Sequence, residues 1–159
     1  MSLLTDAVDI HARDSVVEPR ISYVIARLER AIRAAIGERV KPYGLTTSQY
    51  TTLSVVGTRS GLSNAQLARR AYMTPQSMSE VIDALETRGL IERRTRAGRG
   101  RALPAILTRK GRRVLDSCNR AVDELEEEML RDLSADERAL LAEGLTSAVR
   151  ALHAGLPER

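Results

Sequence analysis

The sequence predicts a mainly α-helical fold with one small β-hairpin. Apolar residues recur at three- and four-residue steps through most of the 159 residues, as in amphipathic helices. Three segments begin with Thr or Ser and carry Gln or Glu three residues later, a pattern typical of helix starts. Two short runs of strand type flank an arginine-rich segment, which indicates a hairpin. The hydrophobic content of 43%, without Phe or Trp, is sufficient for an aliphatic core.

The first long helix is expected to extend from Pro19 to about Val40. Pro19 suits the first helical position, because the N–H that proline lacks would have no partner there. The segment Lys41-Pro-Tyr-Gly44 ends the helix. Residues 1–17 show no clean period and are assigned to an N-terminal arm, with a short helix as the alternative. The apolar face of the helix consists of Ile21, Val24, Ile25, Leu28, Ile32, Ala35 and Ile36.

Three shorter helices are expected between residues 46 and 89. Thr46-Thr-Ser-Gln49 forms a capping box that opens the first of them, which ends near Gly57. Ser63-Asn-Ala-Gln66 forms a second box, and it opens a short helix that extends to Arg70.

The third of these helices follows a turn at Tyr72-Met73. Thr74 is a typical N-cap, Pro75 suits the first helical position, and Gly89 suits the position after the helix end. Two short helices joined in this way form a helix-turn-helix, in which the N-terminal residues of the second helix face base edges in the DNA major groove. The core-facing residues of this second helix are Met78, Val81, Ile82 and Leu85.

The rest of the chain completes a winged helix-turn-helix. Short strands are expected at residues 90–94 and 103–107, around a basic tip of residues 95–102 that forms the wing. Thr108 then caps a long helix, and Ser134-Ala-Asp-Glu137 opens the last one. Their apolar faces comprise Val114, Leu115, Cys118, Val122, Leu125, Met129 and Leu130 in the first helix, and Leu140, Leu141, Leu145, Val149 and Leu152 in the second.

Charge is distributed unevenly along the chain, although the formal net charge is only +4. Residues 88–113 contain ten Lys or Arg and one acid, whereas residues 116–143 contain ten acids and three arginines. A basic patch is typical of polyanion binders, because neutralised phosphates release counterions. A solvated basic loop is the simpler interpretation, but this patch directly follows a helix pair of recognition type. Because aromatic residues are scarce, duplex DNA is favoured over single strands or RNA loops.

The remaining composition argues against several kinds of site. Cys118 is the single cysteine, which excludes an intramolecular disulfide and a cysteine-rich zinc site. His11 and His153 lie at opposite ends of the chain, so neither a metal nor another cofactor is expected. Without a nucleophile–base–orienter set or a glycine-rich phosphate loop, an enzyme is not expected. Since neither a membrane span nor a signal peptide is evident, we expect a cytoplasmic protein without a membrane partner.

Taken together, the residues resemble the MarR family of bacterial transcription regulators. The matching segments, in family order and spacing, are Gly44–Gln49, Leu67-Ala68, Leu85-Glu86, Gly89–Arg94 and Leu107–Gly111. The resemblance extends over roughly residues 20–152. It implies a homodimeric transcription regulator, a repressor, that binds double-stranded DNA sequence-specifically at a pseudo-palindromic operator.

The resemblance also implies a division of the chain. Residues 18–43 and 112–159 would form a helical dimerisation region, and residues 44–111 the winged helix-turn-helix DNA-binding domain. The apolar faces of the first helix and the last two helices exceed what the winged domain alone could cover, which independently favours an interface. A self-contained monomeric bundle is the alternative.

The expected DNA contacts lie at the helix-turn-helix and on the wing. Gln76 can pair bidentately with adenine, and the Ser77 and Ser79 hydroxyls can bond bases or phosphates. Glu80 stands where many relatives have a basic residue; it can accept a hydrogen bond from a cytosine amine or pair with an arginine. The full set of expected contacts is Ser63, Thr74, Pro75, Gln76, Ser77, Ser79, Glu80, Arg96, Arg99 and Arg101.

The wing departs from the family's pattern. Relatives usually carry an Asp followed two positions later by an Arg, which enters the minor groove while the Asp braces it. Here Arg101 matches the Arg, but Arg99 stands in place of the Asp. The tip is therefore expected to be more positive and to lack the brace, while it keeps its attraction for phosphates and for a narrow minor groove.

A ligand is implied by the resemblance as well. Family members commonly bind anionic aromatic compounds between the dimerisation helices and the DNA lobe, so a small anionic or aromatic effector is expected here. The candidate contacts are Tyr23, Arg27, Tyr43 and Tyr50, with ordinary packing as the competing interpretation for each.

Two other functions compete with this interpretation. A cysteine-based redox-sensing regulator would use Cys118, but that residue falls on the apolar stripe of its helix, where cysteine is usually inert packing. A winged helix used only for protein contacts is disfavoured by the basic run of residues 88–113.

Overall fold

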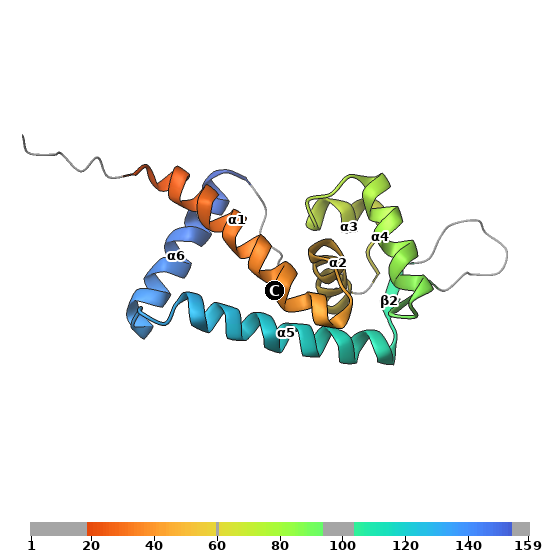
Figure 1. Cartoon of the computed structure of the whole chain (residues 1–159). Helices are drawn as coiled ribbons and strands as arrows, with labels where there is room; N and C mark the ends of the chain where they lie inside the picture. Colours follow the sequence, from red (N-terminus) through yellow and green to blue (C-terminus); the bar gives the residue numbers. More distant parts are fainter. Residues whose placement is uncertain (1–18, 60, 94–103, 154–159) are drawn as a thin grey trace, which may run out of the picture.

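The computed structural model describes residues 19–59, 61–93 and 104–153, whose arrangement Figure 1 shows. The two strands pair antiparallel, with Ile91 opposite Leu107 and Arg93 opposite Ala105. The predicted mainly helical fold with a small β-hairpin is confirmed. In chain order the described elements are α1 (Ile21–Val40), the 3-10 helix η1 (Lys41–Tyr43), α2 (Thr47–Thr58), α3 (Asn64–Arg70), α4 (Pro75–Thr87), β1 (Ile91–Arg93), β2 (Ala105–Leu107), α5 (Arg109–Met129) and α6 (Ala135–Ala151).

The predicted helix starts are confirmed by their capping hydrogen bonds. At the start of α2, the Thr46 hydroxyl accepts from the Gln49 amide at 3.2 Å, while the Gln49 side chain accepts from the Thr46 amide. The same reciprocal box opens α3 and α6. Thr74 and Thr108 cap α4 and α5 with single side-chain hydrogen bonds. Each cap satisfies an amide that has no partner within its helix.

One local prediction was wrong. Pro19 does not occupy the first helical position, because Arg20 is the N-cap with an extended ψ of 138° and α1 begins at Ile21. The predicted end of α2 near Gly57 is confirmed, since the helix ends at Thr58. A Cβ on Gly57 would lie 2.6 Å from Leu115 Cδ2. The glycine therefore also permits close packing of α2 against α5.

The core lies in the lobe formed by α2–α5 and the hairpin. Figure 1 shows α2 between α3, α4 and α5. Buried apolar residues of all four helices belong to one core cluster. Val81 was expected in this core but is only half-buried at its edge. By contrast, Val40 is the only buried residue of α1, and α6 has none. The largest fully buried side chains are Leu53, Met78, Leu85, Leu90, Ile91, Val40, Thr52 and Cys118.

The first turn of α5 is packed directly on the end of the recognition-type helix. The Thr108 hydroxyl donates to the Gly89 carbonyl at 2.7 Å, and the Thr108 amide donates to the Leu90 carbonyl at 3.1 Å. A Cβ on Gly111 would lie 1.8 Å from that same Leu90 oxygen. Only glycine fits here without moving the backbone.

We therefore expect Gly111→Ala to lower the free energy of unfolding by about 2 kcal/mol, the cost of overpacking a rigid site. Urea denaturation followed by circular dichroism measures this change. Gly144→Ala in α6 is the matched control, because nothing lies within 4 Å of its added Cβ. The control should be neutral or stabilising by about 0.5–1 kcal/mol. Equal stability of the two variants would contradict the packing described for Gly111.

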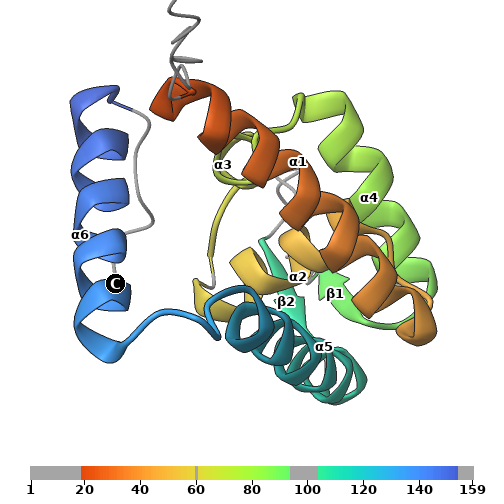
Figure 2. The ribbon, with the colours of Figure 1, turned by 60° about the vertical axis from the view of Figure 1, so that its left-hand side comes forward.

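The terminal helices leave a large apolar surface uncovered. Figure 2 shows α6 standing away from the lobe, connected to it through α5, with the start of α1 also extending beyond the lobe. Arg39 joins α1 to α5 through an ion pair with Glu128 at 2.6 Å. The exposed large apolar residues of these helices and their ends are Ile21, Tyr23, Val24, Ile25, Met129, Leu140, Leu141, Leu145 and Leu152. An apolar surface of this kind marks an interface.

Candidate nucleic-acid interface

α3 and α4 form the helix-turn-helix that the sequence predicts. The turn between them closes through a hydrogen bond from the Met73 amide to the Ala68 carbonyl, at 2.8 Å. Tyr72 adopts a φ of 53°, the left-handed conformation that reverses the chain between the two helices. α4 follows immediately, and its apolar side is anchored by the buried Met78, Ile82 and Leu85. The opposite side of its first turns is left at the surface.

The first turn of α4 presents the residues expected to meet DNA. The Thr74 hydroxyl accepts from the Ser77 amide at 3.1 Å and donates to the Ser77 hydroxyl at 3.0 Å, so these two side chains engage one another. Pro75, Gln76 and Glu80 are exposed. Gln76 thus has an amide at the surface of the first turn, where base-edge contacts are made in this motif. These DNA contacts stay predictions.

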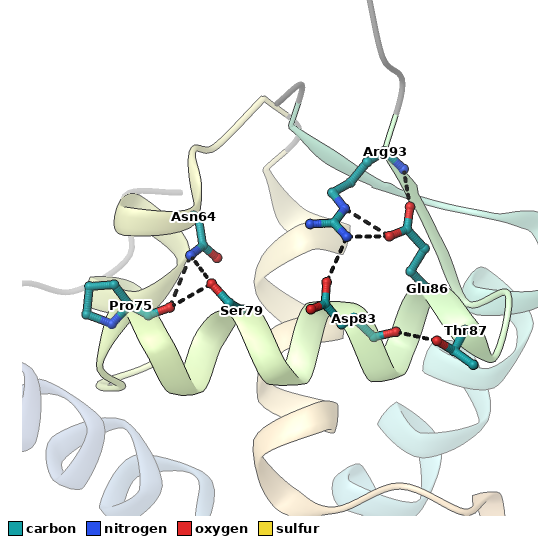
Figure 3. Close-up of polar contacts among 7 residues, drawn as sticks. All are labelled: Asn64, Pro75, Ser79, Asp83, Glu86, Thr87 and Arg93. Carbon is teal, nitrogen blue, oxygen red and sulfur yellow. Dashed lines mark hydrogen bonds and ion pairs between the residues drawn. The ribbon is translucent and has the colours of Figure 1, made fainter. Parts of the chain in front are cut away.

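Asn64 fixes α4 against α3, a contact that sequence analysis missed. Its Nδ2 donates to the Pro75 carbonyl at 3.1 Å and to the Ser79 hydroxyl at 2.9 Å (Figure 3). Ser79 also donates to the Pro75 carbonyl at 3.0 Å. The Ser79 hydroxyl therefore holds the two helices together, beside its predicted role toward DNA. Ser63, the N-cap of α3, uses its hydroxyl to accept from the Gln66 amide.

A second missed contact joins the hairpin to α4. Side chains alternate along a strand, so Arg93 lies on the same face of β1 as the buried Ile91, the face directed at α4. Figure 3 shows its guanidinium between two carboxylates of that helix. Nη2 lies 2.7 Å from Asp83 Oδ1 and 2.5 Å from Glu86 Oε2, and Nε donates to Glu86 Oε2 at 2.9 Å. Hydrogen bonding from Arg93 lowers the pKa of Glu86 below its usual value.

The basic patch is smaller than the count of charges implied. Besides Arg93, Arg88 is used internally: it donates to the carbonyls of Gly44 at 2.6 Å and Tyr43 at 3.1 Å, which joins the end of α4 to η1. Lys110 donates to the Arg88 carbonyl at 2.9 Å. Three of the ten basic residues therefore hold the lobe together. Those left exposed on the first turn of α5 are Arg109, Arg112 and Arg113.

The described residues include the root of the predicted wing. β1 and β2 form its root beside α4, as Figure 1 shows. Residues 94–103, with the predicted contacts Arg96, Arg99 and Arg101, lie outside the described residues. The predicted N-terminal arm of residues 1–17 lies outside them too.

The four candidate effector contacts do not share one site within a single chain. Tyr23 and Arg27 form a pair on α1, with the guanidinium carbon 5.9 Å from the ring centroid. Tyr43 lies in η1, beyond the other end of the 20-residue α1, which at 1.5 Å per residue is about 30 Å long. Tyr50 is half-buried, and its hydroxyl donates to Asn119 Oδ1 on α5 at 3.0 Å.

Cys118 has the environment of a packing residue. It is fully buried in the core, and burial raises the pKa of its thiol. Thiolates rather than thiols react with oxidants, so a buried thiol with a raised pKa is poorly reactive. The redox-sensing alternative is not supported.

Two further absences concern the described residues only. They hold no group of three or more His, Cys, Asp or Glu side chains placed to bind a metal ion. None of their helices has the combined length and hydropathy that a membrane span requires.

The arrangement defines a class of protein. A helix pair with a tight turn, a second helix that exposes its first turns, and a hairpin rooted beside it form a winged helix-turn-helix DNA-binding protein.

The comparisons with known proteins agree with this class. Residues 43–102 match a sequence model described as the MarR family. The HTH-type transcriptional repressor Rv2887 of Mycobacterium tuberculosis is 32% identical over 118 residues, which are 74% of this chain and 85% of that protein.

Solved structures show the same likeness. The crystal structure of Rv2887 in complex with salicylic acid has a TM-score of 0.70 and 30% identity, covering 83% of this chain and 98% of that one. Its structure in complex with DNA has a TM-score of 0.70 and 27% identity, covering 82% and 98%. A probable transcriptional regulator from Pseudomonas aeruginosa has a TM-score of 0.68 and 26% identity, covering 81% and 96%.

The chain belongs to the MarR family. It is a DNA-binding transcriptional regulator and not an enzyme.

Proposed function

We propose that this chain is a homodimeric, cytoplasmic repressor that leaves its operator when a small anionic aromatic acid binds. The observation that carries the proposal is the presence, in one chain, of an exposed reading turn on α4 and an uncovered apolar surface on α1 and α6. The exposed turn of α4 is suited to contact duplex DNA, and the apolar surface of α1 and α6 is suited to pack against the helices of a partner. A second copy of the chain supplies both a partner and a second reading helix.

Dimerisation would determine the form of the operator. A two-fold axis through the α1 and α6 surfaces relates two copies of α4, so the DNA half-sites are related by the same axis. In helix-turn-helix dimers the half-sites lie about one helical turn apart, roughly 10 base pairs centre to centre. Residues 18–43 and 112–159 then form the dimerisation region, and residues 44–111 the DNA-binding domain.

The proposed effector class follows from a relative and from one pair of residues. Rv2887 was crystallised with salicylic acid and with p-aminosalicylic acid, both aromatic carboxylates. In this chain Tyr23 and Arg27 place an exposed ring and a guanidinium side by side on α1. A guanidinium pairs with a carboxylate, and a tyrosine ring stacks on an aromatic one.

The effector proposal is tested with an operator selected by the purified protein from random duplexes. Fluorescence anisotropy measures the Kd for this operator with increasing salicylate, and separately with salicylamide, which has no carboxylate. We expect salicylate to raise the Kd and salicylamide to leave it unchanged. Tight operator binding that ignores both compounds would remove the effector from the proposal and leave the DNA-binding function intact.

The wing gives a separate prediction. Arg101→Ala should weaken binding to most duplexes, because a wing arginine acts on the backbone and groove rather than on one base. The slope of log affinity against log salt should flatten by nearly one unit per half-site, the contribution of one neutralised phosphate. Titrations at several salt concentrations measure this slope, and Arg120→Gln on α5 is the control.

Arg99→Asp tests whether the wing of this protein needs the acid that its relatives carry. The change removes a positive charge and adds a negative one at each tip, so we expect weaker binding and a flatter salt slope. Unchanged or tighter binding would mean that bracing outweighs charge. If neither Arg99→Asp nor Arg101→Ala changed the affinity or the salt slope, the wing would make no DNA contact.

A further inference from the structure

The recognition helix has a charge that is unusual for an element that meets DNA. α4 carries three acids, Glu80, Asp83 and Glu86, and no Lys or Arg between Pro75 and Thr87. Phosphates repel carboxylates on an adjacent helix, and each unpaired acid there weakens binding. Two of the three acids are engaged by Arg93, which belongs to the hairpin and not to the helix.

Arg93 contacts α4 through both its side chain and its backbone. Arg93 binds α4 through its backbone amide as well, which donates to Glu86 Oε1 at 3.3 Å. Asp83 and Glu86 are three residues apart and share one face of the helix, so a single planar guanidinium reaches both. Because Arg93 is the last residue of β1, the contact fixes the strand to α4 at the point where the chain leaves for the wing.

The other end of the same helix stripe is held by α3. Ser79, Asp83 and Glu86 follow one another at steps of four and three residues along α4. Asn64 binds the first of them and Arg93 binds the other two, as Figure 3 shows. Gln76 and Glu80 lie three residues before Ser79 and Asp83, so they border this stripe, and both are exposed. α4 is thus fixed on one side to both α3 and the hairpin while its reading residues stay exposed.

We propose that Asp83, Glu86 and Arg93 form a brace that positions the wing relative to the recognition helix, so that both can contact one DNA half-site together. The inference rests on the proposed function. Arg93 acts through the wing, and is therefore a positioning residue.

The test compares four dimers on the selected operator: wild type, Arg93→Gln, Arg93→Lys, and the triple variant Asp83→Asn/Glu86→Gln/Arg93→Gln. Anisotropy gives each Kd, and hydroxyl-radical footprinting reports whether the minor groove beside each half-site is protected by the wing. Thermal unfolding checks the fold. Arg120→Gln is the charge-matched control, because among the described residues that exposed arginine bonds to Ser117 on α5 itself, at 3.1 Å.

We expect Arg93→Gln to raise the Kd about tenfold and to abolish the minor-groove protection, as for a residue that acts through another element. The triple variant should lose the protection as well, although it removes the two acids together with the arginine. Arg93→Lys should retain part of it, because one ammonium binds one carboxylate at a time. If Arg93→Gln does not fold, the partial protection of Arg93→Lys carries the test.

Two results would overturn the brace. One is wild-type protection and affinity in Arg93→Gln. The other is their recovery in the triple variant, which would assign Arg93 to charge compensation alone. A wild-type protein that binds no duplex would instead contradict the proposed function itself, so the two failures are distinguishable.

Discussion

Replacing Leu141 and Leu145 together by glutamate should convert the protein into a folded monomer that binds its operator about a thousand-fold more weakly than the wild type, because the second half-site is no longer tethered to the first. The two leucines lie one turn apart on α6, with 39% and 36% of their surface exposed. Charges on such a stripe cannot be buried in an interface without partners. Because α6 contributes no buried residue to the lobe, the lobe should remain folded.

Sedimentation velocity distinguishes a monomer of 17.5 kDa from a dimer of twice that mass. Ala139→Glu is the control, because residue 139 lies one turn before Glu143 on the polar side of α6. It should sediment as a dimer and bind the operator like the wild type. A double leucine variant that remained dimeric would place the interface elsewhere.

Gln76→Ala should cost about 1–3 kcal/mol for each half-site, as expected for the loss of a bidentate base contact. Both half-sites lose the contact in a homodimer, so the Kd of the operator should rise at least about thirtyfold. Preference at one base position per half-site should disappear as well. These changes are measured by anisotropy on the operator and on its single-base variants.

The non-specific duplex is the internal control for Gln76→Ala. A base-edge contact carries sequence information, so binding to random DNA should be unchanged. Equal weakening on operator and random DNA would show that Gln76 contacts the backbone. No weakening on either would remove it from the interface.

Helix starts were predictable because their determinants are local. The hydroxyl of Thr46 or Ser134 acts on an amide three residues away, and both residues of the pair are visible in the sequence. Pro19 shows the limit of such rules, because proline is also compatible with the extended residues before a helix. The end of α2 near Gly57 was predictable, but the packing of Gly57 against a leucine on α5, 58 residues further along, was not.

The contacts that position α4 could not be predicted in the same way. Asn64 binds Ser79, and Arg93 binds Asp83 and Glu86, across a turn whose geometry decides which faces meet. Counting charges therefore assigned Arg93 to the DNA-facing patch. In the sequence, alternation along β1 was the one available sign, since it places Arg93 on the side of the buried Ile91.

The effector candidates lie apart within one chain for a related reason, and they stay predictions. Residue type alone selected Tyr23 and Tyr43, and the length of α1 separates them. The spacing of residues along one chain does not show which residues a second chain would bring to a shared site.

Selection of DNA by the purified dimer from a random pool, followed by sequencing, tests the central claim most directly. The account predicts duplex sites that are pseudo-palindromic, with half-sites about 10 base pairs apart, one for each copy of α4. Enrichment of asymmetric sites alone, or of single-stranded sequences, would contradict it.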